Sequence, residues 1–134
     1  MYAYTAEHKT SIDFEVKTYE IDVAGHVNNI VYVKWLEDLR IKLFSQLLPI
    51  ENLVNEKLYP VVTFTIINYK KQLKLGDKPC GTMCIDNVRH NMMNLKFSIV
   101  NKGIACANGE QKCVLMNTGT GLMDKEKLKY VFNV

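Results

Sequence analysis

A long helical pattern in the first half of the chain limits its possible folds more than any other feature. Between residues 28 and 48, apolar side chains recur every three or four positions: Tyr32, Leu36, Leu39, Leu43 and Leu47. Asn28 or Asn29 can cap the start, because an asparagine side chain accepts a free backbone N–H there. Pro49 disfavours helical geometry at Leu48 and ends the pattern. The predicted helix has roughly 20 residues and is about 30 Å long, so other elements must wrap around it.

Strand patterns lie on both sides of this helix. Before it, Ile12, Phe14 and Val16 alternate with charged residues, which predicts a half-buried strand that runs to about Tyr19. After it, strands are predicted over residues 61–69, 80–88, 95–99 and 104–117, separated by turn signals at 76–77, 89–91 and 101–103. We interpret Gly109 as a bulge inside the last strand.

These elements predict an α+β fold made of one domain over residues 1–134. A short helix over residues 124–132, capped by Asp124, is expected to close the chain. One strand, one long helix and four antiparallel strands can bury their apolar faces if a single sheet curls around the helix. The free edge of that sheet and the ends of the helix favour dimerisation.

Composition excludes several classes of protein. Hydrophobic residues make up 48% of the 134 positions, which is enough for a packed core. The net charge is +3, and no cluster of lysine and arginine alternates with aromatic residues, so we expect no nucleic-acid partner. No export signal or membrane-length apolar run is visible, so we expect a cytoplasmic protein without a membrane span, or one cut from a larger precursor.

The four cysteines are expected to be free thiols. Cys80, Cys84, Cys106 and Cys113 have C-x3-C and C-x6-C spacings, which do not match the common structural zinc sites. We predict no metal site.

The loop before the helix contains the residues best suited to chemistry. It holds Asp22, Gly25 and His26, and it leads into the N-terminus of the helix at Asn28 and Asn29. A helix N-terminus presents unpaired N–H groups and a partial positive charge, which together can hold an oxyanion beside a base. The simpler interpretations are that Asp22 forms the turn, that His26 is an ordinary loop residue, and that the asparagines only cap the helix.

The residues of this region resemble a known family. The string Tyr19-Glu-Ile-Asp-Val-Ala-Gly-His-Val-Asn-Asn29, followed by Tyr32, Trp35, Glu37 and Arg40, is similar to the signature of hotdog-fold acyl-CoA thioesterases, in particular the 4-hydroxybenzoyl-CoA thioesterase-like group. The His-Val-Asn-Asn part also resembles plant acyl-ACP thioesterases. The likeness covers about residues 12–122, and in this group the step at residues 107–109 is a small-residue bulge.

The resemblance implies a fold, an assembly and a set of site residues. It implies a five-stranded antiparallel sheet around the helix, and a homodimer or dimer of dimers with active sites at the subunit interface. Asp22 matches the catalytic carboxylate, Gly25 the glycine beside the substrate carbonyl, and the backbone N–H of Asn29 the oxyanion donor. His26 and Asn28 match groups that the plant-type enzymes use, although many members of the group have an apolar residue in place of His26. Val27 and Tyr32 are further candidates for binding substrate.

The expected reaction is hydrolysis of an acyl-CoA or acyl-ACP thioester. Asp22 would attack the carbonyl itself or activate water as a general base, and the sequence leaves both routes open. No cofactor is needed, since coenzyme A is part of the substrate. The phosphates could contact surface cations, for which the candidates are Lys70, Lys71, Lys74 and Arg89.

Several alternatives remain open at this point. One is a non-catalytic module that binds acyl-CoA, and another is a hotdog dehydratase or hydratase, although the hydratase motif is absent. Glu37 and Arg40 are expected to form a structural pair on the helix. Trp35 and the pair Met92-Met93 could line an acyl pocket, but packing in the core is the expected role.

Overall fold

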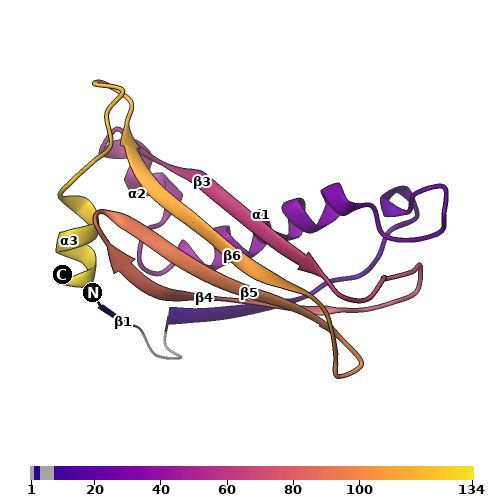
Figure 1. The fold of residues 1–134 in the computed structure, drawn as a ribbon. Helices are drawn as coiled ribbons and strands as arrows, with labels where there is room; N and C mark the ends of the chain where they lie inside the picture. Colours follow the sequence, from indigo (N-terminus) through magenta and orange to yellow (C-terminus); the bar gives the residue numbers. More distant parts are fainter. Residues whose placement is uncertain (1, 4–7) are drawn as a thin grey trace.

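The computed structural model describes residues 2–3 and 8–134, which form one curved antiparallel sheet with a long helix along its concave face (Figure 1). The strands are β1 (Tyr2–Ala3), β2 (Lys9–Asp13), β3 (Leu58–Tyr69), β4 (Cys80–Arg89), β5 (Met92–Asn101) and β6 (Ile104–Asn117). The helices are η2, a 3-10 helix (Thr18–Glu20), α1 (Asn29–Phe44), α2 (Ile50–Asn55) and α3 (Lys127–Phe132).

The sheet confirms the predicted hotdog fold. Its strands follow the order β4-β5-β6-β3, and β1 and β2 both pair with β4 at the other side. They share that edge, because Tyr2 pairs with Val88 and Lys9 pairs with Cys84. The sheet therefore has five positions across, and all of its pairs are antiparallel. β3 is the last strand, and its outer edge pairs with no other described strand.

The first predicted strand was placed too far along the chain. β2 ends at Asp13, although Phe14 and Val16 beyond it are buried as the alternating pattern indicated. The backbone N–H of Phe14 donates to the Pro79 carbonyl at 2.8 Å, and that of Val16 donates to the Asp77 carbonyl at 3.3 Å. The segment thus forms its backbone hydrogen bonds with a loop and not with a strand. The alternating pattern therefore indicated which side chains are buried, but not that the backbone pairs within the sheet.

The central helix is shorter than predicted. α1 ends at Phe44, because Ser45 caps it and the Ser45 hydroxyl donates to the Lys42 carbonyl at 2.6 Å. Pro49 then starts α2, which the sequence did not predict. A proline is tolerated at a helix start, where its missing N–H would have no partner, so Pro49 marks the beginning of a second helix instead of the end of the first.

One face of α1 packs against the sheet. Its buried residues are Val31, Tyr32, Trp35, Leu36, Leu39, Leu43 and Phe44. Trp35 stacks on Phe14 with ring centroids 4.9 Å apart, which confirms its predicted place in the core. The opposite face is also apolar in part, since the side chains of Ile30, Val33 and Ile41 are 60%, 47% and 59% exposed.

The predicted bulge in the last strand lies elsewhere. Gly109 pairs regularly with Ile67 on one side and Phe97 on the other, so the prediction of a bulge at Gly109 was wrong. The extra residue of β6 is Cys106, which lies between the regular pairs formed by its two neighbours. Glycine is required at 109 for another reason, because a Cβ there would overlap the carbonyl oxygen of Ile66 on β3.

The predicted turns are confirmed. His90 and Asn91 both adopt positive φ values between β4 and β5, and Lys102 and Gly103 do the same between β5 and β6. Two consecutive positive φ values are typical of the tightest hairpin loops. Gly76, with a φ of 93°, forms the third predicted turn.

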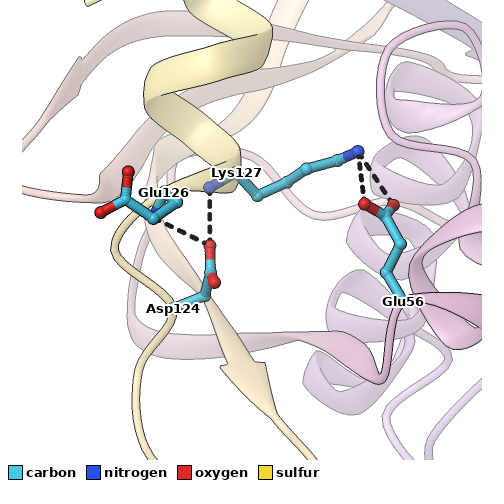
Figure 2. A network of polar contacts seen from close by, with 4 residues as sticks. All are labelled: Glu56, Asp124, Glu126 and Lys127. Atoms are coloured by element: carbon cyan, nitrogen blue, oxygen red, sulfur yellow. Dashed lines mark hydrogen bonds and ion pairs between the residues drawn. The ribbon is translucent and has the colours of Figure 1, made fainter.

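The C-terminal helix closes the end of the molecule near α2 (Figure 1). α3 begins three residues later than predicted, but Asp124 still caps it: its carboxylate accepts from the N–H groups of Glu126 at 3.1 Å and Lys127 at 2.7 Å. The Lys127 ammonium also pairs with the Glu56 carboxylate at 2.9 Å, which ties α3 to the end of α2 (Figure 2).

Two further predictions concern the described residues. All four cysteines are free thiols, and Cys106 and Cys113 are buried. In the part of the chain that the structure describes, the helices are too short or too polar to cross a membrane.

Candidate active site

Asp22 organises the loop before α1. Its backbone N–H donates to the His26 carbonyl at 2.8 Å, and its own carbonyl accepts from Gly25 at 3.0 Å. Its side-chain Oδ1 accepts from the backbone N–H groups of Ala24 at 2.9 Å and His26 at 3.1 Å. Oδ2 accepts no hydrogen bond from any described residue, so one carboxylate oxygen fixes the loop and the other is available for chemistry.

The loop conformation depends on Gly25. Its φ is 81°, a left-handed conformation that side chains with a Cβ rarely adopt. No atom lies within 4 Å of where a Cβ would be, so backbone conformation and not crowding requires glycine here.

A free backbone donor lies at the first turn of α1. Asn28 caps the helix, with its side-chain oxygen accepting from the N–H of Ile30 at 3.1 Å, and its carbonyl accepting from the N–H of Val31 at 2.9 Å. The N–H of Asn28 donates to the Glu20 carbonyl at 2.9 Å. The N–H of Asn29 donates to no acceptor among the described residues. This leaves one unpaired donor at the positive end of the helix.

Asp22 and Asn29 face the same cavity, which has a volume of about 510 Å³. Its lining residues are Asp22, His26, Val27, Asn29, Tyr32, Tyr69, Lys70, Lys71 and Gln72. The cavity thus gathers five of the seven residues that the sequence singled out. Gly25 and Asn28 do not line it: Gly25 shapes the loop through its backbone, and the Asn28 side chain caps α1.

Tyr32 forms the buried wall of this cavity. Its ring meets that of Tyr69 edge to face, with centroids 5.2 Å apart. Burial, together with the nearby Cys106 and Tyr69, raises the pKa of Tyr32 to about 12. Tyr32 therefore keeps its proton at neutral pH and can donate a hydrogen bond, but it cannot serve as a base.

The structure separates the cationic candidates. Lys70 and Lys71 line the cavity of Asp22, whereas Arg89 lines a different cavity beside α3. Within a single chain, Arg89 therefore does not share the cavity of Asp22. Lys74 approaches the site through its backbone, which forms a bridge with His26. Tyr69 and Gln72 were missed, because β3 brings residue 69 to the helix from a distant part of the sequence.

The expected pair of Glu37 and Arg40 on α1 is not formed. The Arg40 guanidinium donates to the buried Gln111 side chain at 2.8 Å, and the described residues contain no ion pair between Arg40 and Glu37. Both residues line a second cavity, farther along the helix.

Solved structures that are similar to this fold include several thioesterases. A DHNA-CoA thioesterase from Staphylococcus aureus matches 93% of this chain and 84% of its own, with a TM-score of 0.83 and 20% identity. A thioesterase from Thermus thermophilus, solved with coenzyme A and Zn, matches 90% and 88%, with a TM-score of 0.75 and 22% identity. An acyl-ACP thioesterase from Bacteroides thetaiotaomicron matches 90% and 50%, with a TM-score of 0.82 and 15% identity. At these identities the similarity shows the fold alone.

The family follows from the sequence itself. A comparison with curated proteins finds no match. A family model described as the thioesterase-like superfamily matches residues 16–129, which include the Asp22 loop, α1 and all four long strands. The chain therefore belongs to the thioesterase-like superfamily.

Proposed function

We propose that this protein hydrolyses acyl thioesters, with Asp22 and the backbone N–H of Asn29 as its reacting groups. The observation that carries the proposal is that an unpaired helix N-terminal donor and a carboxylate with one free oxygen face the same cavity. Thioester hydrolysis needs these two functions, a donor for the developing oxyanion and a group that delivers a nucleophile.

The two groups act on opposite parts of the carbonyl. In this mechanism the substrate carbonyl oxygen accepts from Asn29 N–H, where the α1 dipole adds to the stabilisation. The free oxygen of Asp22 attacks the carbonyl carbon, or removes a proton from a water that does so. The tetrahedral intermediate then expels the thiolate, which takes up a proton to become the free thiol. On the direct-attack route the acyl group remains on Asp22 as an anhydride, and water hydrolyses it to release the acid and restore the carboxylate.

Two lysines at the cavity favour a substrate whose acyl group is attached to a carrier that contains phosphate groups. Lys70 and Lys71 lie at the mouth of the cavity, and both side chains are exposed. Coenzyme A and the phosphopantetheine arm of acyl carrier protein both bring phosphates, which bind to such cations. Because coenzyme A carries more phosphate, we expect acyl-CoA to be the better substrate.

We further propose that the active unit is a homodimer. Asp22 is exposed in the single chain, although a reacting carboxylate works best where water is excluded. The outer edge of β3, a strand of 12 residues, pairs with no other strand in the described part of the chain, and Ile30, Val33 and Ile41 expose an apolar face of α1 beside it. A second copy that pairs along β3 would cover this edge and this face together. Light scattering after size-exclusion chromatography should give twice the mass of the chain.

The test is turnover of acyl-CoA and acyl-ACP esters, with free thiol as the readout, by the wild type and by Asp22→Asn. Asparagine keeps an oxygen that can accept from Ala24 and His26, so the loop should retain its shape. We expect kcat to fall by at least about a hundredfold.

The matched control is Asp38→Asn, an exposed aspartate on α1, which should keep full activity. Normal turnover by a folded Asp22→Asn variant would refute the role of Asp22. A wild type that binds acyl-CoA without releasing thiol would instead support a binding module.

A further inference from the structure

The hydroxyl of Tyr32 is a polar group with no hydrogen-bond partner in the described part of the chain. Tyr32 is only 3% exposed, and it lines the cavity that Asp22 and Asn29 share. Although most of the side chain is buried, solvent still reaches the hydroxyl oxygen. An unpaired hydroxyl on an otherwise buried side chain is costly unless it can bond to something that enters the cavity. The Tyr32 hydroxyl is therefore placed to meet a ligand.

Aromatic neighbours fix the ring of Tyr32 without using its hydroxyl. The ring meets that of Tyr69 edge to face, with centroids 5.2 Å apart and an interplanar angle of 83°. It meets the ring of Trp35 in the same manner, at 5.4 Å and 63°. Such pairs stabilise a buried ring by about 0.5–1.5 kcal/mol each beyond the burial of area. The direction of the hydroxyl is thus set before any ligand binds.

The position of Tyr32 on α1 brings its side chain toward the unpaired N–H of Asn29. Residues three apart on a helix lie on the same face, with Cβ atoms about 5–6 Å from each other. Helical side chains also lean toward the N-terminus of the helix, so the ring of Tyr32 extends over the first turn. Both residues line the same cavity. The hydroxyl and the N–H therefore approach one region of it from neighbouring positions.

Tyr32 can act there only as a hydrogen-bond donor or acceptor, and not as a base. Burial raises the pKa of its phenol to about 12, so the proton stays on the oxygen. The hydroxyl does not hold the catalytic carboxylate, because Oδ1 of Asp22 accepts from the backbone of Ala24 and His26, and Oδ2 accepts from no described residue. An uncommitted, protonated phenol beside a helix N-terminus is suited to an oxygen that gains negative charge.

We propose that Tyr32 is a catalytic residue whose hydroxyl donates a second hydrogen bond to the thioester carbonyl oxygen, beside the bond from the N–H of Asn29. The inference rests on the proposed function, because it concerns the same carbonyl group. The phenol keeps its proton throughout, and Asp22 alone delivers the nucleophile. The bond strengthens as charge develops on the oxygen, so it stabilises the transition state more than the bound ester.

The first measurement is the turnover of hexanoyl-CoA and benzoyl-CoA by Tyr32→Phe, with free thiol as the readout. Phenylalanine keeps the ring and its aromatic contacts and removes only an unpaired hydroxyl, so the free energy of unfolding should change little. We expect kcat to fall about tenfold to a thousandfold while KM changes little, as for an interaction made in the transition state. The matched control is Tyr130→Phe, the same change at a tyrosine of α3 that is 85% exposed, which should alter neither constant.

The second measurement observes the carbonyl directly and does not depend on turnover. The probes are ketone analogues of hexanoyl-CoA and benzoyl-CoA, in which a methylene group replaces the thioester sulfur and the carbonyl carbon is ¹³C. Hydrogen bonds to a carbonyl oxygen lower its stretching frequency in the infrared spectrum. We expect the band of the bound analogue to lie at lower frequency in the wild type and in Tyr130→Phe than in Tyr32→Phe.

Each outcome decides the inference. It is overturned by an unchanged kcat in Tyr32→Phe, by an equal loss in Tyr130→Phe, or by a carbonyl band at the same frequency in the wild type and Tyr32→Phe. A rise in KM at constant kcat would place the hydroxyl against another part of the substrate and also overturns it. Failure of the proposed function is recognised separately, as a wild type that releases no thiol from any ester, and the carbonyl band alone then decides the role of Tyr32.

Discussion

Asp22 and His26 are joined by hydrogen bonds in both directions, one between their backbones and one from the His26 backbone to the Asp22 side chain. The Asp22 N–H donates to the His26 carbonyl at 2.8 Å, and the His26 N–H donates to the Asp22 carboxylate at 3.1 Å. The backbone of His26, and not its imidazole, thus orients the carboxylate. This arrangement explains how a loop residue that is exposed to solvent can hold a defined direction.

The first prediction follows for His26→Ala. The substitution keeps both backbone bonds, so the Asp22 carboxylate should keep its orientation. We expect kcat to fall less than about tenfold, well below the effect of losing a general base. Thiol release under saturating substrate measures this, and a loss as large as that of Asp22→Asn would show that the imidazole takes part in the chemistry.

Gly25→Ala should disturb the loop without crowding it. Alanine at a φ of 81° costs about 1–2 kcal/mol, or else the turn changes shape and moves Asp22. We expect a lower free energy of unfolding and a loss of kcat with little change in the mass of the assembly. The control is Gly119→Ala, at a glycine outside the left-handed region, which should leave kcat unchanged.

Substitutions of Asn28 should separate helix capping from catalysis. Asn28→Ala loses the bond from the Ile30 N–H and should reduce the free energy of unfolding by about 1 kcal/mol. Asn28→Asp keeps a capping oxygen, and its charge favours the helix start, so stability should be retained. The same negative charge opposes an oxyanion at Asn29, and kcat of Asn28→Asp should fall.

Urea unfolding and turnover, measured on both Asn28 variants, check this prediction. An Asn28→Asp variant with full stability and full activity would argue against an oxyanion at this helix terminus.

Cys113 should make the protein less stable in alkali. Burial raises the pKa of its thiol from the ordinary 9.0 to about 11. Below pH 9 the thiol is protonated in both states and its contribution is complete. Between pH 9 and 11 the unfolded chain loses the proton while the folded chain keeps it, so stability falls by about 2–3 kcal/mol.

The measurement is the free energy of unfolding at several pH values from 8 to 11. Cys113→Ala should be less stable throughout, because it leaves a small cavity, but its decline with pH should be shallower. Cys84→Ala controls for the loss of a half-buried thiol. Parallel curves for the wild type and Cys113→Ala would contradict the assignment.

Gly109→Ala should weaken the attachment of β3. The added Cβ meets backbone, which cannot rotate away as a side chain could, so the strands must separate locally. We expect a loss of about 1–3 kcal/mol in the free energy of unfolding. Because β3 also carries Tyr69 and the proposed dimer edge, the variant should dissociate at higher protein concentration than the wild type, as light scattering would show.

Local patterns were enough to predict most of the secondary structure. The spacing of Tyr32, Leu36 and Leu39 predicted α1, and the glycine and asparagine turn residues predicted the hairpins, since both signals depend on neighbours in the chain. The predicted ends of helices and strands were less accurate where tertiary contacts set those ends. Phe14 bonds to Pro79 and not to a strand, and Ser45 ends α1 before Pro49 can.

The sequence alone determined the hotdog fold, the position of the Asp22 loop before α1, and the membership of the thioesterase-like superfamily. These features reside in short motifs and in the order of the elements. Only the tertiary structure decided that Arg40 bonds to Gln111 and not to Glu37, that Gly109 permits close packing without forming a bulge, and that Tyr69 shares a cavity with Asp22. Each of these contacts joins residues far apart in the chain, whose approach is set by sheet register and packing and not by local propensity.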